Sequence, residues 1–132
     1  MSKQIFVNLP VKNLNRAVSF FTHLGFSFNQ EFTDENATCM VVSDNIFVML
    51  LVEPFFQTFT KKEVADATRT AEVIVALSAG SRGEVNDYIR KAVEAGGTTP
   101  NEATDHGWMY VHGFQDPDGH LWEFTYMEQQ QQ

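Results

Sequence analysis

The stretch FQDPDGHLWEF, residues 114–124, carries the strongest local signal in the chain. Pro117 presets the backbone angle of a turn position, and Gly119 suits the positive φ with which such a turn ends. Aromatic and apolar residues flank the turn on both sides, which is typical of two antiparallel strands. The stretch therefore predicts a β-hairpin close to the carboxyl end of the sequence.

Upstream of this hairpin, the same order of elements occurs twice. Residues 4–11 (QIFVNLPV) form a short apolar strand, and apolar residues then recur at helical spacing up to Leu24. Residues 72–79 (EVIVALSA) start the repeat, followed by a second helical stripe from Val85 to Val93. Three extended segments follow each helix, at residues 26–32, 37–43 and 45–52, and at residues 98–102, 108–114 and 120–127.

Both expected helices have recognisable ends. Asn13 is placed to cap the first helix, and Gly25 can adopt the left-handed conformation that ends it. Ser81 and Glu84 form an S-x-x-E capping box at the start of the second helix, which Gly96 then ends. These local signals support the assignment of both helices.

One strand-helix-three-strand unit cannot cover both faces of its sheet, so we expect two βαβββ modules to pack together in an α+β fold. The expected organisation is a single domain over residues 1–132. Its parts are a first module at 4–52, a linker or lid at 53–70, a second module at 71–127 and a frayed tail at 128–132.

Composition excludes several classes of function. The formal net charge of −8 and the scattered Lys and Arg disfavour nucleic acid as a partner. No apolar run reaches the roughly 18 residues of a membrane span, so no membrane partner is expected. The single cysteine, Cys39, rules out an intrachain disulfide framework and suits the reducing cytoplasm.

With these elements in order, the sequence resembles the vicinal-oxygen-chelate superfamily of glyoxalase I, bleomycin-resistance proteins, methylmalonyl-CoA epimerase and extradiol dioxygenases. The resemblance covers residues 4–127. It is carried by FQDPDGHLWEF and, near the amino end, by VNLPVKNL at 7–14 and FFTHLGF at 20–26. It implies that the two modules form an incomplete, U-shaped mixed barrel around a cleft.

The resemblance also implies where a divalent metal is held, on the first and last strand of each module. Those positions fall at Phe6, close to Val48, at Ile74 and at Glu123. Only Glu123 has a ligand atom for zinc, nickel or iron, whose sites need about three or four donors. We therefore expect no metal and no other cofactor.

A metal site made mainly of residues outside those family positions remains an alternative. Asp105, His106, His112 and Glu123 supply oxygen and nitrogen donors near the end of the second module, where zinc, nickel or iron could bind. No close ligand spacing supports this site.

His112 and Glu123 are the candidate catalytic residues. If residues 116–119 form a four-residue hairpin loop, Gln115 pairs with His120, and His112 lies directly opposite Glu123. A carboxylate beside an imidazole raises the pKa of the imidazole and fixes its tautomer, as acid-base catalysis requires. The alternative is a partly exposed ion pair on the surface of the strands that takes no part in catalysis.

The expected cleft is lined from both modules. Asn8 lies on the same strand face as Phe6, where a ligand, Glu123 or a neighbouring strand could satisfy its amide. The candidate ligand-binding residues are Phe6, Asn8, Met49, Ile74, Tyr110, His112, Glu123 and Thr125.

The leading hypothesis for function is a metal-independent, small-molecule-binding protein. It is similar to the bleomycin-resistance branch, which protects by binding and commonly forms homodimers. The alternative is a lactoylglutathione-lyase-like enzyme, an isomerase or a dioxygenase, with an unusual metal site or the His112 and Glu123 pair. A third alternative, a dimerising or regulatory module, requires a cleft filled by side chains such as Phe6, Phe55 and Trp122.

Overall fold

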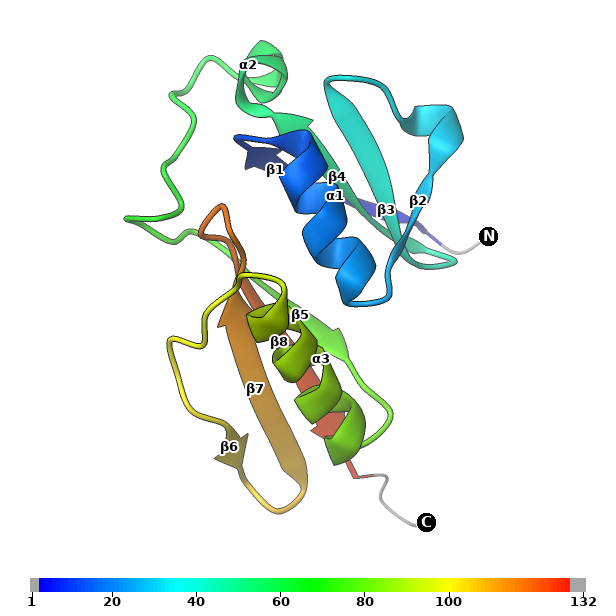
Figure 1. The fold of residues 1–132 in the computed structure, drawn as a ribbon, viewed down its shortest axis with the longest axis vertical. Helices are drawn as coiled ribbons and strands as arrows, with labels where there is room; N and C mark the ends of the chain where they lie inside the picture. The colour runs from blue at the N-terminus through cyan, green and yellow to red at the C-terminus, as the bar shows by residue number, and fades with distance from the viewer. Residues whose placement is uncertain (1–2, 129–132) are drawn as a thin grey trace. The chain divides into compact units, whose positions relative to one another are not determined.

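A computed structural model describes residues 3–128 and shows two mixed four-stranded sheets (Figure 1). Each sheet carries a helix on one face, and the chain divides into compact units at Met1–Asp66 and Ala67–Gln132. The α+β class and the repeated strand-helix-three-strand order are confirmed. Residues 129–132 of the predicted frayed tail lie outside the described residues.

In the first module, the strands follow the spatial order β1-β4-β3-β2. The first and last strands run parallel, whereas β4 and β3 form an antiparallel hairpin. Helix α1 buries Phe20 and Phe21 beneath it, as its apolar spacing predicts. The elements are β1 (Ile5–Val11), α1 (Leu14–His23), β2 (Ser27–Asn29), β3 (Ala37–Ser43) and β4 (Ile46–Val52).

The second module repeats this topology in the order β5-β8-β7-β6. Strand β5 is parallel to β8, and β8 is antiparallel to β7. Helix α3 contacts β7 and β8 and buries Val85, Ile89 and Ala92. The elements are β5 (Ile74–Ser78), α3 (Arg82–Glu94), β6 (Thr104–Asp105), β7 (Met109–Gln115) and β8 (Leu121–Met127).

The predicted helix caps form with one change. The Asn13 side chain accepts a hydrogen bond from the Arg16 backbone N–H at 3.0 Å, and Ser81 Oγ accepts one from the Glu84 N–H at 3.0 Å. The Glu84 carboxylate accepts from the N–H of Gly80, at 3.2 Å, and not from that of Ser81. The hydrogen bond that the Glu84 side chain completes is thus made one residue earlier than the capping box predicts.

Two predicted strands are wrong in part. Residues 98–102 make only an isolated bridge at Thr98, because Pro100 has no N–H to donate to a sheet. The edge strand β6 instead starts at Thr104. The segment 26–32 divides into β2 and a 3₁₀ turn, which the Asn29 side chain caps.

The segment after β4 is locally helical. It forms α2 (Glu53–Phe56) and a 3₁₀ turn at Gln57–Phe59, in which the rings of Phe55 and Phe59 meet edge to face at 5.1 Å. The role of this segment as a lid stays a prediction. None of the helices within residues 3–128 has the length and apolar character that crossing a membrane requires.

Candidate functional site

The turn of the last hairpin sets which side chains share a face of the second sheet. The Asp116 N–H donates to His120 O at 2.9 Å, and the Gly119 N–H donates to Asp116 O at 2.9 Å. Gly119 has a φ of 94°, so the turn is a three-residue loop with a glycine bulge. Gln115 consequently pairs with Leu121. The predicted four-residue loop, with Gln115 opposite His120, is wrong.

This change reverses the predicted relation of the two candidate catalytic residues. His112 lies opposite Phe124, and Glu123 lies opposite Gly113. A shift of one residue moves a side chain to the other face of a strand. The prediction that His112 and Glu123 are cross-strand partners is therefore wrong, because the hairpin loop has an odd number of residues.

Other contacts identify the two faces. The Tyr110 hydroxyl donates to Asn86 Oδ1 of α3 at 2.7 Å, so Tyr110 and His112, two residues apart, point to the helix side of β7. Glu123 and Thr125 occupy the opposite, helix-free side. The expectation that all four side chains share one face is wrong; each pair takes a different face.

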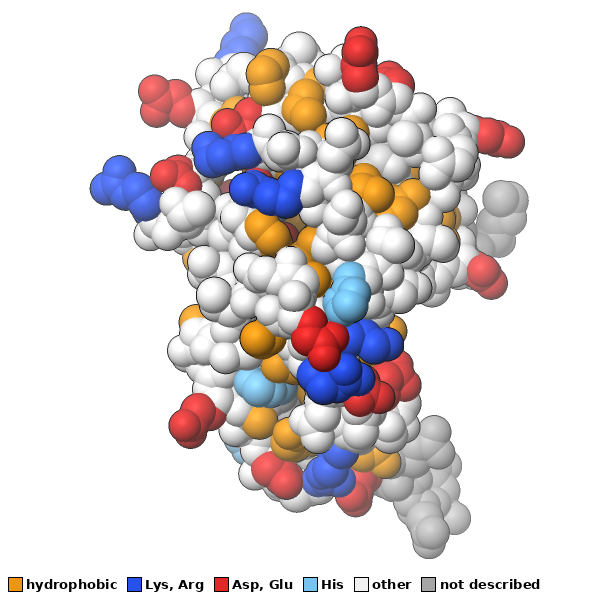
Figure 2. Space-filling model, in the orientation of Figure 1, with side chains coloured by type: hydrophobic (Ala, Val, Ile, Leu, Met, Phe, Trp, Pro, Cys, Tyr) orange, Lys and Arg blue, Asp and Glu red, His pale blue; other side chains and the backbone are white. Residues whose placement is uncertain are grey.

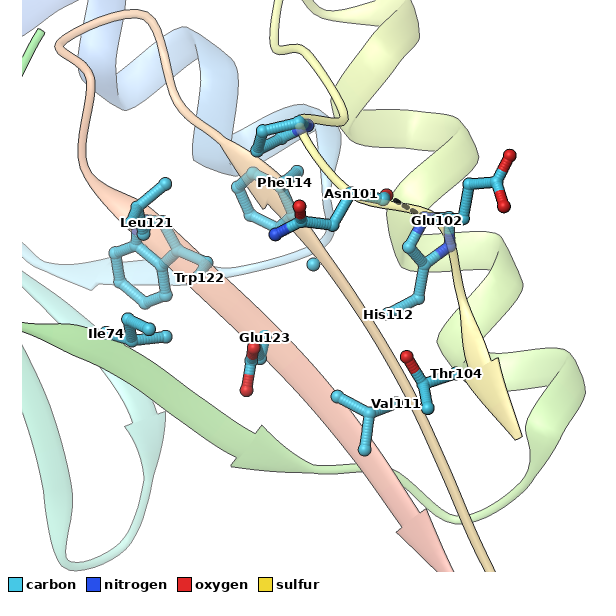
Figure 3. Close-up of a pocket in the computed structure, with 12 residues that line it drawn as sticks. Ile74, Asn101, Glu102, Thr104, Val111, His112, Phe114, Leu121, Trp122 and Glu123 are labelled. Carbon is cyan, nitrogen blue, oxygen red and sulfur yellow. Dashed lines mark hydrogen bonds between the residues drawn. The ribbon is translucent and has the colours of Figure 1, made fainter. Parts of the chain in front are cut away.

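The second module holds a cavity of about 310 Å³ at the edge of β7, lined by residues from both faces of the sheet (Figure 3). It lies between the segment at residues 100–104 and strands β7 and β8. The lining is mixed, with aliphatic, aromatic, amide and carboxylate side chains. The lining residues are Ile74, Pro100, Asn101, Glu102, Thr104, Val111, His112, Gly113, Phe114, Leu121, Trp122 and Glu123.

An interruption in the pairing of β7 makes room for this cavity. Thr98 and Gln115 exchange two backbone hydrogen bonds, of 3.0 and 2.7 Å, and pairing resumes where Thr104 meets Val111. Between these points the edge segment has two residues more than β7, so residues 99–103 loop outward. The sequence patterns did not predict this loop; the signal available was Pro100 within a polar stretch.

His112 holds the outward loop. Its Nε2 lies 3.2 Å from Asn101 O, and because a carbonyl only accepts, Nε2 carries the donated proton. In Figure 3 the His112 ring points to Asn101, while the Glu123 carboxylate lies across β7 from it. This contact links His112 of β7 to the outward loop at the wall of the cavity.

Glu123 lies where Gly113 leaves space. A Cβ at Gly113 would be 2.5 Å from Trp122 O and 3.1 Å from Glu123 Cγ, so a larger residue does not fit. Glu123 is half-buried and makes no hydrogen bond or ion pair with any residue that the structure describes. An unpaired carboxylate at the side of a cavity is available to a ligand.

The candidate residues of the first module form a mainly apolar surface. Phe6 is half-exposed and stacks on Phe47 with ring centres 4.9 Å apart. Asn8 is exposed rather than buried, and its Nδ2 donates to Phe6 O at 3.2 Å. Val48 is buried in the core, so its neighbour Met49, the parallel partner of Asn8, takes the helix-free side.

The four positions at which the superfamily resemblance implies metal ligands can be matched by register. Met49 pairs with Asn8 in the first module as Glu123 pairs with Ala76 in the second. Phe6, Met49 and Ile74 offer no oxygen, imidazole or thiolate to a zinc, nickel or iron ion. The donor set at these positions does not fit the metal.

The alternative metal site also lacks a gathered donor set. Asp105 instead accepts from Arg82 at 3.1 Å and from the Gly107 N–H at 2.8 Å, and these contacts, the Gly107 bond first, lower its pKa. Within residues 3–128, no three His, Cys, Asp or Glu side chains come close enough to hold an ion.

The prediction that both modules line a common cleft stays a prediction.

Comparison with known proteins identifies one family. A family model described as the Glyoxalase/Bleomycin resistance protein/Dioxygenase superfamily matches residues 3–124. Comparison with curated proteins gives no match.

Solved structures show a similar fold. A hypothetical protein from S. aureus is 27% identical, with a TM-score of 0.81 over 96% of this chain and 94% of that one. A glyoxalase/bleomycin resistance protein/dioxygenase family enzyme from Burkholderia phytofirmans is 11% identical, with a TM-score of 0.79 over 96% and 99%. A bleomycin resistance determinant encoded on transposon Tn5 is 17% identical, with a TM-score of 0.67 over 97% and 100%.

Proposed function

Because the chain belongs to the glyoxalase/bleomycin resistance protein/dioxygenase superfamily, we propose that it binds a small organic molecule without a divalent metal. One observation carries this proposal. Three of the four positions expected to hold the metal are Phe6, Met49 and Ile74, and only Glu123 has a suitable donor. A single carboxylate cannot fix the coordination geometry of zinc, nickel or iron.

The cavity of the second module supports binding. Ligand sites are usually concave and mostly apolar, with a few polar groups that orient the ligand. Here Ile74 and Leu121 supply apolar surface, while Asn101 and Glu123 supply polar atoms. Sequestration of a drug or metabolite is the function that needs only these features.

The enzyme alternative has weaker support. A lyase or dioxygenase of this superfamily would use a metal ion to polarise its substrate, and the donor set does not fit one. A metal-free acid-base pair would need His112 and Glu123 together, whereas the register places them on opposite faces of the sheet. The geometry therefore favours binding over catalysis.

Two further expectations belong to this proposal. We propose a homodimer, in keeping with the superfamily resemblance and with half-exposed apolar side chains such as Ile5 and Val73. We also propose a cytoplasmic location, since Cys39 has no partner cysteine in the sequence. Light scattering after size-exclusion chromatography tests the dimer, and a monomer at micromolar concentration would contradict it.

The metal-free character can be tested directly. Protein purified without chelator is analysed for bound metal by mass spectrometry, then titrated with zinc, nickel and ferrous ions, with Glu123→Gln as the paired variant. We expect metal content well below one ion per chain and no difference between the two proteins. Stoichiometric metal that is lost in Glu123→Gln would overturn the proposal.

A fragment screen completes the test. Protein-observed NMR in the presence of EDTA should find small molecules that shift the amide signals of cavity residues such as Val111 and Leu121. Fragments that bind only after metal is added would contradict metal-independent binding.

A further inference from the structure

We propose that the cavity of the second module binds a small organic cation, of the ammonium, amidinium or guanidinium type, that also carries an amide or similar donor-acceptor group. The inference rests on the proposed function and names its ligand class and binding site. It follows from three features of the cavity: its charge, an unpaired strand edge and a missing side chain.

The charge of the lining is one-sided. Glu102 and Glu123 are its carboxylates, and no Lys or Arg lines the cavity. The lining imidazole, that of His112, already donates from Nε2 to Asn101 O. Because neither carboxylate forms a hydrogen bond or ion pair within residues 3–128, a ligand cation would supply the missing counter-charge.

Several other carboxylates of the second module have basic partners, unlike those of the cavity. Acidic and basic side chains are interspersed on the visible surface (Figure 2). The second module pairs Arg82 with Asp105 and Glu128, and Arg90 with Asp87 and Glu94. The carboxylate of Glu123 has no such pairing, although Glu123 is less exposed than the acidic members of these pairs.

The edge of β7 offers a second recognition element. Gln115 exchanges both its backbone bonds with Thr98, so its N–H and C=O point away from β8. The groups of Gly113, two residues earlier, point the same way. There the segment 99–103 loops outward, and no backbone hydrogen bond joins it to Gly113 in the part of the chain that the structure describes. A ligand amide can donate to one of these groups and accept from the other.

Because Gly113 has no side chain, the Glu123 carboxylate and the backbone edge of β7 can contact the same ligand molecule. The Gly113 backbone edge and the Glu123 side chain both line the cavity, and a Cβ at Gly113 would lie 3.1 Å from Glu123 Cγ. Ile74 and Leu121, which are partners on β5 and β8, provide apolar surface for a short carbon chain between cation and amide. A volume of about 310 Å³ accommodates a molecule of amino-acid-amide size.

The test uses two probes that differ in charge but hardly in shape. N-acetyl-L-argininamide carries a guanidinium, and N-acetyl-L-citrullinamide carries a neutral urea in its place. Each is titrated into the ¹⁵N-labelled, full-length protein with EDTA present, and the Gly113 amide signal is followed. We expect both probes to shift this signal, with the guanidinium probe binding about tenfold more tightly.

Substitutions separate a local effect from net charge. Glu123→Gln should remove the advantage of the guanidinium probe, so that the two probes bind with similar affinity. Glu35→Gln removes the same charge from an exposed turn outside the cavity lining and should keep the advantage. Equal losses in both variants would overturn a specific role for Glu123.

The remaining outcomes tell the two proposals apart. Equal affinity for the two probes at Gly113 would overturn the cation class while the proposed function stands. No shift of Gly113 with either probe would overturn the site. Shifts that appear only after metal is added would overturn the proposed function itself.

Discussion

The two modules share an order of elements but place their bulky side chains on different elements. In the first module, helix α1 brings Phe20 and Phe21 to the core. In the second module, the buried residues of α3 are aliphatic, and β8 supplies the large rings of Trp122 and Phe124. Close packing between a helix and its sheet requires a certain total side-chain volume, and the two modules divide that volume differently between helix and strand.

The helix-free sides of the sheets also differ. Phe6 and Met49 make that side of the first module apolar, whereas the second module has the carboxylate of Glu123 there, beside a cavity of mixed lining. The same scaffold therefore carries an apolar surface in one half and the proposed recognition groups in the other. We expect substitutions to affect stability or binding according to these assignments.

The largest expected effect sharpens the contrast between core and surface aromatics. Phe124→Ala removes a ring that is 1% exposed and stacks on Tyr88 at 4.1 Å, and should lower the free energy of unfolding by about 3–5 kcal/mol. Phe6→Ala removes a half-exposed ring that stacks on Phe47, and should cost about 1 kcal/mol. Urea denaturation measures both, and equal costs would break the comparison.

An intermediate effect compares glycines in the left-handed region. Gly119→Ala combines a φ of 94° with a Cβ placed 2.6 Å from the Ala67 carbonyl carbon, and should cost about 2–4 kcal/mol. Gly25→Ala in the first module has a φ of 104° but open space around the new Cβ, and should cost about 1–2 kcal/mol. A smaller loss for Gly119 than for Gly25 in thermal unfolding would contradict the close packing at this turn.

The smallest expected effect concerns Asp105, whose pKa is lowered first by the Gly107 N–H and then by Arg82. Since its folded pKa lies below the ordinary value of 3.8, its contribution is present above about pH 4 and is lost as pH falls through the folded pKa. The Gly107 amide signal in NMR should titrate with a midpoint below 3.8 in the natural protein and stay flat in Asp105→Asn. A midpoint at or above 3.8 would refute the predicted contact.

Much of the fold follows from local patterns. The helix caps at Asn13 and Ser81, the positive φ of Gly119 and the order of the strands agree with the sequence-based predictions. These features depend on residues only a few positions apart, so the sequence shows them directly. The superfamily could be identified from the same patterns.

The candidate site was predicted less well. Its residues were placed on the correct strands, but the pairing of His112 with Glu123 depended on whether the hairpin loop had three or four residues. The sequence of the turn suits either length, and one residue decides the face of every side chain beyond it. The cavity was not predicted, since it arises from unequal chain lengths on two paired edges.

The sequence by itself determined the order of elements and the loss of ligand atoms at Phe6 and Ile74, because a residue type excludes coordination in any conformation. Only the tertiary structure decided that His112 supports Asn101 while Glu123 is left unpaired beside Gly113. Those relations depend on strand register and on the outward loop at 99–103, which are set by packing between segments distant in sequence.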